Sequence, residues 1–154
     1  MEEIIKKLTD NNKTISTMES CTGGGVANYI TNFEGASSVF HFTAVTYSNE
    51  FKIKMGVSSD VIDKYSVYSM ETAIEMSKNI ATFANSNYGI GITGKLNRID
   101  KENPYGKDNV VYCCIYDRDR NQCNTFSLEV NKNNREDNKK IVIAEIINKL
   151  KTII

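Results

Sequence analysis

The chain has 154 residues, of which 40% are apolar and 25% charged, and its 19 basic and 19 acidic side chains give a net charge of zero. This length suits one domain with one buried core, so we expect residues 1–154 to form a single domain, and the balanced charge argues against a nucleic-acid partner. No apolar run approaches the roughly 18 residues of a membrane span, and no signal-peptide pattern begins the chain, so we expect a cytoplasmic protein without a membrane partner.

The first third of the chain alternates helical and extended segments. Apolar periodicity predicts a short amphipathic helix over residues 1–8, and β-branched residues predict a strand over residues 14–18. A modest helix over residues 26–31 follows three glycines, and a loop over residues 33–38 follows that helix. Residues 39–47 are apolar on both sides of the alternation, which favours a central strand covered on both faces.

The middle of the chain is predicted to hold its longest central helix. Residues 48–52 turn away from the preceding strand, and a short helix ends near Lys64. Ser69 is expected to cap the long helix, because a serine hydroxyl accepts hydrogen bonds from free amides at a helix start. A strand over residues 88–93 follows and is broken by Gly94. The buried face of the long helix is predicted to contain Ala73, Ile74, Met76, Ile80 and Phe83.

The last third contains a polar loop, a hairpin and a closing helix. Residues 95–108 include the only proline and read as a long surface loop, a type that is often functional. Residues 109–116 and 123–130 form two strands of a hairpin, and residues 134–150 form the last helix. This element order predicts an α/β fold, a three-layer α/β/α sandwich with a mixed β-sheet.

The cysteines and the single histidine do not form a metal-site pattern. C-x-x-C spacing is absent and His41 lies in a predicted strand, so we expect no metal site and no cofactor. Cys113 and Cys114 are adjacent in a predicted strand and should point to opposite faces as small buried side chains. Cys21, in a predicted loop, is the only cysteine that could be reactive.

Residues 89–94 match the dinucleotide-binding pattern G-x-G-x-x-G in letters only. That pattern requires its glycines between a strand and a helix, because their amides must approach a phosphate at the helix start. Here the glycines lie inside a predicted strand, and a polar loop follows. We interpret the match as chance, and a P-loop is excluded because the spacing of its glycines is absent.

The run Thr-Ile-Ser-Thr-Met-Glu-Ser-Cys-Thr-Gly-Gly-Gly at residues 14–25 joins a strand to a helix through a sharp polar turn. A hydroxyl at this position lies beside unpaired backbone amides, which can hold a phosphate or a developing oxyanion. Ser20 could therefore be a nucleophile. Alternatively, Ser20 or Thr22 is simply the N-cap of the helix.

A general base for Ser20 would have to come from another strand end. If strands 14–18 and 39–47 are parallel, their carboxyl ends meet at one edge of the sheet. Tyr47, Lys52 and the Thr93-Gly94 pair would then converge with Ser20. A lysine can act as a base once desolvation lowers its pKa, whereas Lys52 could equally be one of many solvated lysines.

Several motifs together resemble one family. They are Met18-Glu-Ser-Cys-Thr-Gly-Gly24, Glu34-Gly-Ala-Ser37, Thr46-Tyr-Ser-Asn-Glu-Phe-Lys52, Met55-Gly-Val57 and Gly91-Ile-Thr-Gly94, with Asn134-Arg-Glu136 as a further element. In this order and spacing they resemble the CinA C-terminal domain, the nicotinamide-nucleotide amidase (nicotinamide mononucleotide deamidase) family. The resemblance spans essentially the whole chain, and the combination is far more specific than any single piece.

The resemblance implies hydrolysis of the carboxamide of nicotinamide mononucleotide to nicotinic acid mononucleotide and ammonia. It implies a metal-independent homodimer in which Ser20 is the nucleophile and Lys52 and Tyr47 assist it. The substrate is a small-molecule nucleotide, and Arg135 or helix amides would hold its phosphate. The substrate-binding residues implied are Thr22, Gly23, Gly24, Asn49, Thr93, Gly94 and Arg135.

The chain departs from the family pattern where substrate is expected. The family has a glycine-rich T-G-x-A-G-P-x-G loop, but residues 93–100 read Thr-Gly-Lys-Leu-Asn-Arg-Ile-Asp, and His41-Phe42 replaces a glycine pair. Lys95 and Arg98 could form a substitute phosphate clamp or be solvated loop charges. A second hypothesis is therefore an inactive or re-purposed member that binds a nucleotide or a protein partner. Cys21 as the nucleophile is a third.

Overall fold

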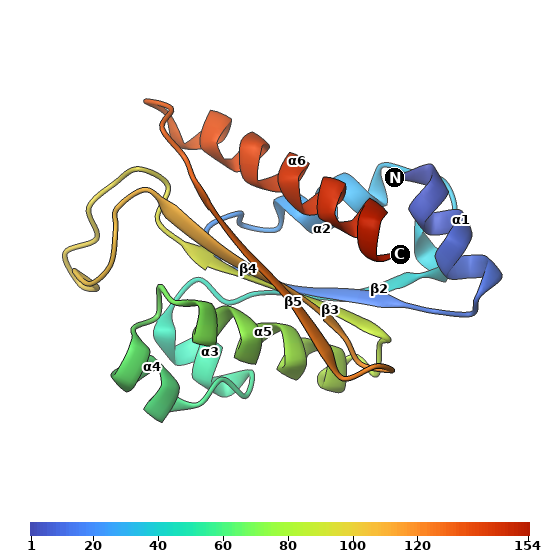
Figure 1. Cartoon of the computed structure of the whole chain (residues 1–154), viewed down its shortest axis with the longest axis horizontal. Helices are drawn as coiled ribbons and strands as arrows, with labels where there is room; N and C mark the ends of the chain where they lie inside the picture. The colour runs from blue at the N-terminus through green and yellow to red at the C-terminus, as the bar shows by residue number, and fades with distance from the viewer.

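The computed structural model describes residues 1–154 as a five-stranded mixed sheet between two layers of helices (Figure 1). The strand order is β2-β1-β3-β4-β5, in which β1 is parallel to both β2 and β3, while β4 is antiparallel to β3 and β5. The prediction of a three-layer α/β/α sandwich with a mixed sheet is confirmed. The strands are β1 (Ile15–Glu19), β2 (Phe40–Val45), β3 (Tyr88–Gly94), β4 (Val110–Asp117) and β5 (Gln122–Glu129).

Helices α1, α2 and α6 cover one face of the sheet, and both chain termini lie on that side (Figure 1). The amphipathic helix α1 buries Ile4, Ile5 and Leu8 in the largest hydrophobic cluster. Helix α6 starts where the Asn134 side chain accepts a hydrogen bond from the Asp137 amide at 2.8 Å, which satisfies one free amide of its first turn. The bounds are α1 (Glu2–Asp10), α2 (Gly25–Thr31) and α6 (Arg135–Ile153), with a short 3₁₀ turn at Ala36–Ser38.

Helices α3 (Asn49–Lys54), α4 (Ser59–Tyr65) and α5 (Met70–Phe83) cover the other face. Ser69 caps α5 as predicted, since its hydroxyl accepts a hydrogen bond from the Thr72 amide at 3.1 Å. Helix α5 packs so closely on β3 that a Cβ added at Gly91 would lie 2.1 Å from a carbonyl oxygen of the helix. The glycines of residues 89–94 therefore serve helix–strand packing inside β3, which agrees with rejecting a dinucleotide-binding motif.

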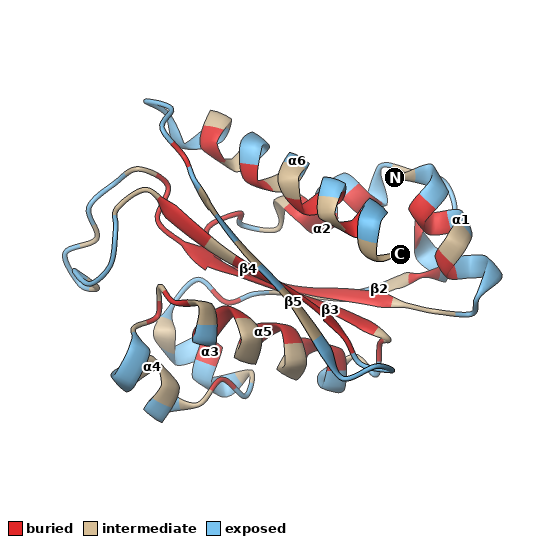
Figure 2. Cartoon of the chain, viewed as in Figure 1, coloured by how far each residue is buried: buried red, intermediate tan, exposed pale blue.

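The sheet is most deeply buried at its centre, where nearly every residue of β1, β3 and β4 is buried (Figure 2). Residues of β5 alternate between half-buried and exposed, as in a strand with one covered face. Cys113 and Cys114 are both buried and belong to hydrophobic clusters on opposite faces, as predicted. No helix is both long enough and apolar enough to cross a membrane.

Three sequence predictions about this layer arrangement are wrong. The segment predicted as a central strand is β2, an edge strand whose residues are half-buried or exposed, because β1 takes the central position between β2 and β3. His41 is exposed on this edge. Phe83, predicted in the core, is exposed and packs on Phe42 with ring centroids 5.0 Å apart. The predicted turn at residues 48–52 forms most of α3.

Candidate active site

The carboxyl ends of the parallel strands β1, β2 and β3 meet at one edge of the sheet, and a cavity of about 680 Å³ opens there. Ser20 follows β1, Tyr47 and Lys52 follow β2, and Gly94 ends β3. The predicted convergence of these chain segments is therefore present. The loop of residues 95–108 and the start of α6 complete the wall, which includes Ser20, Cys21, Tyr47, Asn49, Lys52, Gly94, Lys95, Asp100 and Arg135.

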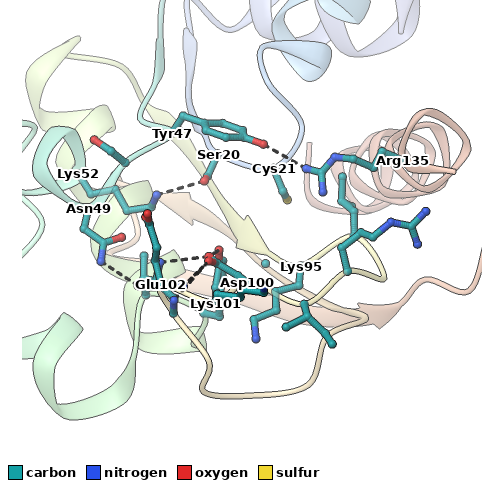
Figure 3. A pocket seen from close by; sticks show the side chains of 18 of the residues that line it. Ser20, Cys21, Tyr47, Asn49, Lys52, Lys95, Asp100, Lys101, Glu102 and Arg135 are labelled. Atoms are coloured by element: carbon teal, nitrogen blue, oxygen red, sulfur yellow. Dashed lines mark hydrogen bonds between the residues drawn. The ribbon is translucent and has the colours of Figure 1, made fainter.

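A buried lysine lies against the serine hydroxyl. The Lys52 side chain is only 1% exposed, and its Nζ atom is 3.1 Å from Ser20 Oγ and donates a second hydrogen bond to the Thr46 carbonyl oxygen at 2.7 Å (Figure 3). Helix α3 positions this lysine, and the Ser48 hydroxyl caps the helix by accepting a hydrogen bond from the Phe51 amide at 3.3 Å. The alternative that Lys52 is a solvated surface lysine is wrong.

Burial lowers the pKa of Lys52 to about 8, because the charged ammonium loses its hydration in this site. No carboxylate lies within 4 Å of Nζ to offset that loss. Roughly a tenth of such a lysine is neutral at pH 7, compared with less than about a thousandth of a solvated lysine. The lone pair of the neutral amine can then take the proton of Ser20.

Glu19, which sequence analysis did not single out, holds the turn after β1. Its carboxylate is fully buried and accepts hydrogen bonds from the amides of Val26 at 3.1 Å and Ala27 at 2.9 Å, both in the first turn of α2. The Thr22 hydroxyl donates a third hydrogen bond at 2.6 Å and the Thr17 hydroxyl a fourth at 3.3 Å. The buried Glu19 carboxylate thus stabilises the positive N-terminal end of α2. The Val26 and Ala27 amides are therefore not free to bind a ligand.

The N-cap alternative for Ser20 or Thr22 is wrong, since Gly24 is the N-cap of α2 and no side chain at that position caps the helix. The signal that could have identified Glu19 is its position at the junction of a strand and a glycine-led helix, where an acidic side chain is favoured. Gly24 has φ 86°, a left-handed conformation that a glycine adopts without strain.

Four of the seven predicted binding residues do not line the cavity. They are Thr22, Gly23, Gly24 and Thr93, whereas Asn49, Gly94 and Arg135 do line it. The Thr22 hydroxyl faces Glu19, and the buried Thr93 hydroxyl donates to the Val67 carbonyl oxygen at 2.8 Å.

Tyr47 is 64% exposed, and its hydroxyl accepts a hydrogen bond from Arg135 Nη2 at 3.1 Å. Figure 3 shows its ring along one side of the cavity with the hydroxyl directed toward α6. Tyr47 makes no hydrogen bond to Ser20 or Lys52. Arg135 has no carboxylate partner, so its guanidinium charge is available at the cavity.

The loop of residues 95–108 is tied to its own surroundings. The buried ammonium of Lys95 pairs with Asp108 at 2.9 Å and lies 5.3 Å from the centre of the Tyr68 ring. Arg98 Nη2 donates to the Asn133 carbonyl oxygen at 2.7 Å, which links the loop to the segment before α6. The sequence left open a phosphate clamp or solvated loop charges. Lys95 is buried and paired, so it is not a solvated charge, whereas Arg98 is exposed, and the contacts of both side chains within the chain argue against a phosphate clamp.

Cys21 lies beside Ser20 on the cavity wall and is buried. Burial raises the pKa of its thiol to about 12, although Lys52 and Arg135 act in the opposite direction. A thiol needs to be deprotonated to attack, so Cys21 is a poor nucleophile at neutral pH. Its burial and raised pKa therefore argue against Cys21 as the nucleophile.

Comparison with known proteins shows which family the chain belongs to. The fold is similar to a crystal structure of the competence/damage inducible protein CihA from Agrobacterium tumefaciens, with a TM-score of 0.84, 25% identity, and coverage of 97% of this chain and 92% of that one. A CinA superfamily protein from Escherichia coli gives a TM-score of 0.85 at 22% identity, covering 97% of this chain and 85% of that one.

Sequence relatives named as competence-damage inducible proteins are longer than this chain. One from Clostridium beijerinckii is 49% identical over 96 residues, which are 61% of this chain and 23% of the relative. One from Clostridium perfringens is 48% identical over the same length. The chain thus aligns with about a quarter of the length of these relatives. A family model described as the CinA C-terminal domain matches residues 1–154, and the chain belongs to that family.

Proposed function

We propose that the protein hydrolyses the carboxamide of nicotinamide mononucleotide, releasing ammonia and nicotinic acid mononucleotide. The observation that carries this proposal is the buried Lys52 amine 3.1 Å from the Ser20 hydroxyl, with a lowered pKa, at the wall of a 680 Å³ cavity. A serine with a neutral amine as its base is suited to acyl transfer. The family resemblance supplies the substrate, and the geometry supports the chemistry.

In the first half of the reaction, Ser20 Oγ attacks the carboxamide carbon while its proton passes to Lys52 Nζ. The resulting ammonium returns this proton to the amide nitrogen, the C–N bond breaks, and ammonia leaves. An ester between Ser20 and the pyridine carbonyl remains. In the second half, water attacks this ester with Lys52 again as the base, and the carboxylate product and the free serine form.

The oxyanion that forms when Ser20 attacks the carboxamide needs hydrogen-bond donors that are not already bonded within the chain. The Cys21 and Thr22 amides directly follow the nucleophile and donate to no oxygen of the chain, so we assign the oxyanion to them. The amides of α2 that Glu19 occupies are excluded from this role. Removing one such donor typically costs about 3–4 kcal/mol of barrier lowering.

The phosphate of the substrate needs a cation that is not already paired. Lys95 is engaged by Asp108, and Arg98 by a backbone carbonyl, whereas Arg135 bonds only the neutral Tyr47 hydroxyl. Besides the base Lys52, the cavity-lining cations without a carboxylate partner are Arg135 and Lys101. We assign the phosphate to Arg135, because its planar guanidinium can bind a phosphate through two hydrogen bonds. The assistance of Tyr47 then consists in holding this guanidinium at the cavity.

The pH dependence of ammonia release tests the role of Lys52. Because burial lowers its pKa to about 8 and only the neutral amine can act as a base, kcat/KM should rise about tenfold per pH unit below pH 8 and level off above it. The measurement is kcat/KM for nicotinamide mononucleotide from pH 6 to 10. The exposed Lys54→Met variant on the same helix should keep this profile.

A rate that falls as pH passes 8 would mean that the cationic form of Lys52 is required, and the base assignment would be wrong. Absence of ammonia release at every pH would instead favour the second hypothesis, a member that binds a nucleotide or a protein without catalysis.

A further inference from the structure

The loop of residues 95–108 is organised around one carboxylate on the cavity wall, that of Asp100 (Figure 3). The Tyr68 hydroxyl donates to Asp100 Oδ2, and Asn103 Nδ2 donates to the same oxygen at 3.1 Å. The amides of Glu102 and Asn103 donate to Oδ1 at 3.0 and 3.3 Å. Each carboxylate oxygen therefore has two donors, which is about the full hydrogen-bonding capacity of the group.

The carboxylate is ionised and forms no ion pair within the chain. The hydrogen bond from Tyr68, followed by those from Asn103 and the loop amides, holds the pKa of Asp100 below its usual value. No lysine or arginine nitrogen lies within 4 Å of it, and the nearby Lys95 is paired with Asp108 instead. The half-buried Asp100 thus places a negative charge without an ion-pair partner at a cavity that also contains Ser20.

The chemistry of this charge restricts the ligand that it suits. A saturated carboxylate has little capacity left for an N–H donor, so an ammonium or amide group would gain few hydrogen bonds from it. A cation without any N–H bond has no hydrogen bond to make, so it loses nothing at a saturated carboxylate and is still attracted to its negative charge. A pyridinium ring whose nitrogen is bonded to ribose is a cation of this kind, since its charge is delocalised and its nitrogen has no hydrogen.

We propose that Asp100 is a specificity-determining residue that recognises the positive charge of an N-ribosyl pyridinium ring while Ser20 attacks the carboxamide of the same ring. This inference rests on the proposed amidase function and names the feature of the substrate that this loop selects. The cation of the ligand supplies the counter-ion that Asp100 lacks. Ligands with the same shape and a neutral ring lose this contact.

The test compares two ligands that differ in ring charge. Dissociation constants for nicotinamide mononucleotide, whose ring is cationic, and for its reduced form, whose ring is neutral, are measured on the Ser20→Ala protein, which cannot turn over. Adding Asp100→Asn should weaken binding of the cationic ligand about five- to tenfold and change binding of the neutral ligand less than twofold. Adding Asp60→Asn, an exposed carboxylate on α4, should change neither.

A second variant separates charge from loop structure. Tyr68→Phe removes one donor to Asp100 and keeps the carboxylate, so any weakening through a loosened loop should affect both ligands alike. If Asp100→Asn also weakens both ligands equally, or changes neither, recognition of the ring charge by Asp100 is refuted. If Ser20→Ala binds neither ligand, the substrate assignment fails and this inference fails with it, a result distinct from loss of discrimination.

Discussion

Replacing Lys52 with methionine is expected to abolish ammonia release and, at pH 7, to raise the free energy of unfolding by about 2–3 kcal/mol. The lysine has a pKa of about 8 in the folded chain and about 10.5 when unfolded, so the folded state binds this proton more weakly. The resulting destabilisation is fully present below pH 8 and disappears as pH rises from 8 to 10.5. Methionine fills the space without a charge to desolvate.

Thermal unfolding at pH 6 to 10 measures this effect. The midpoint of Lys52→Met should exceed that of the wild type by several degrees at pH 7, and the difference should shrink above pH 8. Lys52→Met also loses the hydrogen bond to the Thr46 carbonyl oxygen, which makes the expected gain in stability smaller. Lys54→Met, an exposed substitution on the same helix, should change the midpoint little at any pH. A Lys52→Met protein that is less stable than wild type at pH 7 would contradict the assignment of Lys52 as a strained functional group.

Replacing Glu19 with alanine is expected to lower the free energy of unfolding by about 3–4 kcal/mol, because it leaves the Val26 and Ala27 amides and the Thr22 hydroxyl without their acceptor in a buried place. Glu19→Gln keeps the shape and one acceptor oxygen, so its loss should be about half as large. Denaturant unfolding at pH 7 measures both.

The matched control is Glu3→Ala, an exposed acidic residue in the first turn of α1, which should change stability by less than about 1 kcal/mol. If Glu19→Ala also changes the free energy of unfolding by less than about 1 kcal/mol, the Glu19 carboxylate does not hold the turn. The expected destabilisation also predicts weaker ammonia release, since Ser20 directly follows Glu19 in the turn.

Sequence patterns were sufficient to predict that the candidate catalytic residues lie together at the strand ends. Parallel strands end at one edge of a sheet, so Ser20 and Lys52, which follow neighbouring strands, could be brought together by topology alone. Their hydrogen bond and the burial of Lys52 could not be predicted, because they depend on how α3 packs. The roles of Tyr47 and Arg135 stay predictions, with one hydrogen bond between them as the structural fact.

Sequence analysis missed Glu19 and Asp100 because no local pattern indicates their contacts, whether the partner is near in the sequence or far from it. Glu19 binds amides seven and eight residues away. The nearby hydroxyls of Ser20 and Thr22 are more usual helix caps, so the sequence favoured them for this role. Asp100 binds Tyr68, 32 residues earlier, within a loop that has no periodicity. Local sequence patterns also do not show the order of strands in a sheet. The apolar character of β2 therefore predicts a central strand, although β2 lies at the edge.

Ammonia release from nicotinamide mononucleotide by the wild-type protein and by Ser20→Ala is the decisive test of Ser20 as the nucleophile of an amidase. We expect steady release by the wild type, release by Cys21→Ala at a similar rate, and loss of release by a factor of at least about 10³ in Ser20→Ala. Release by Ser20→Ala at the wild-type rate, or no release by a folded wild-type protein, would contradict this expectation.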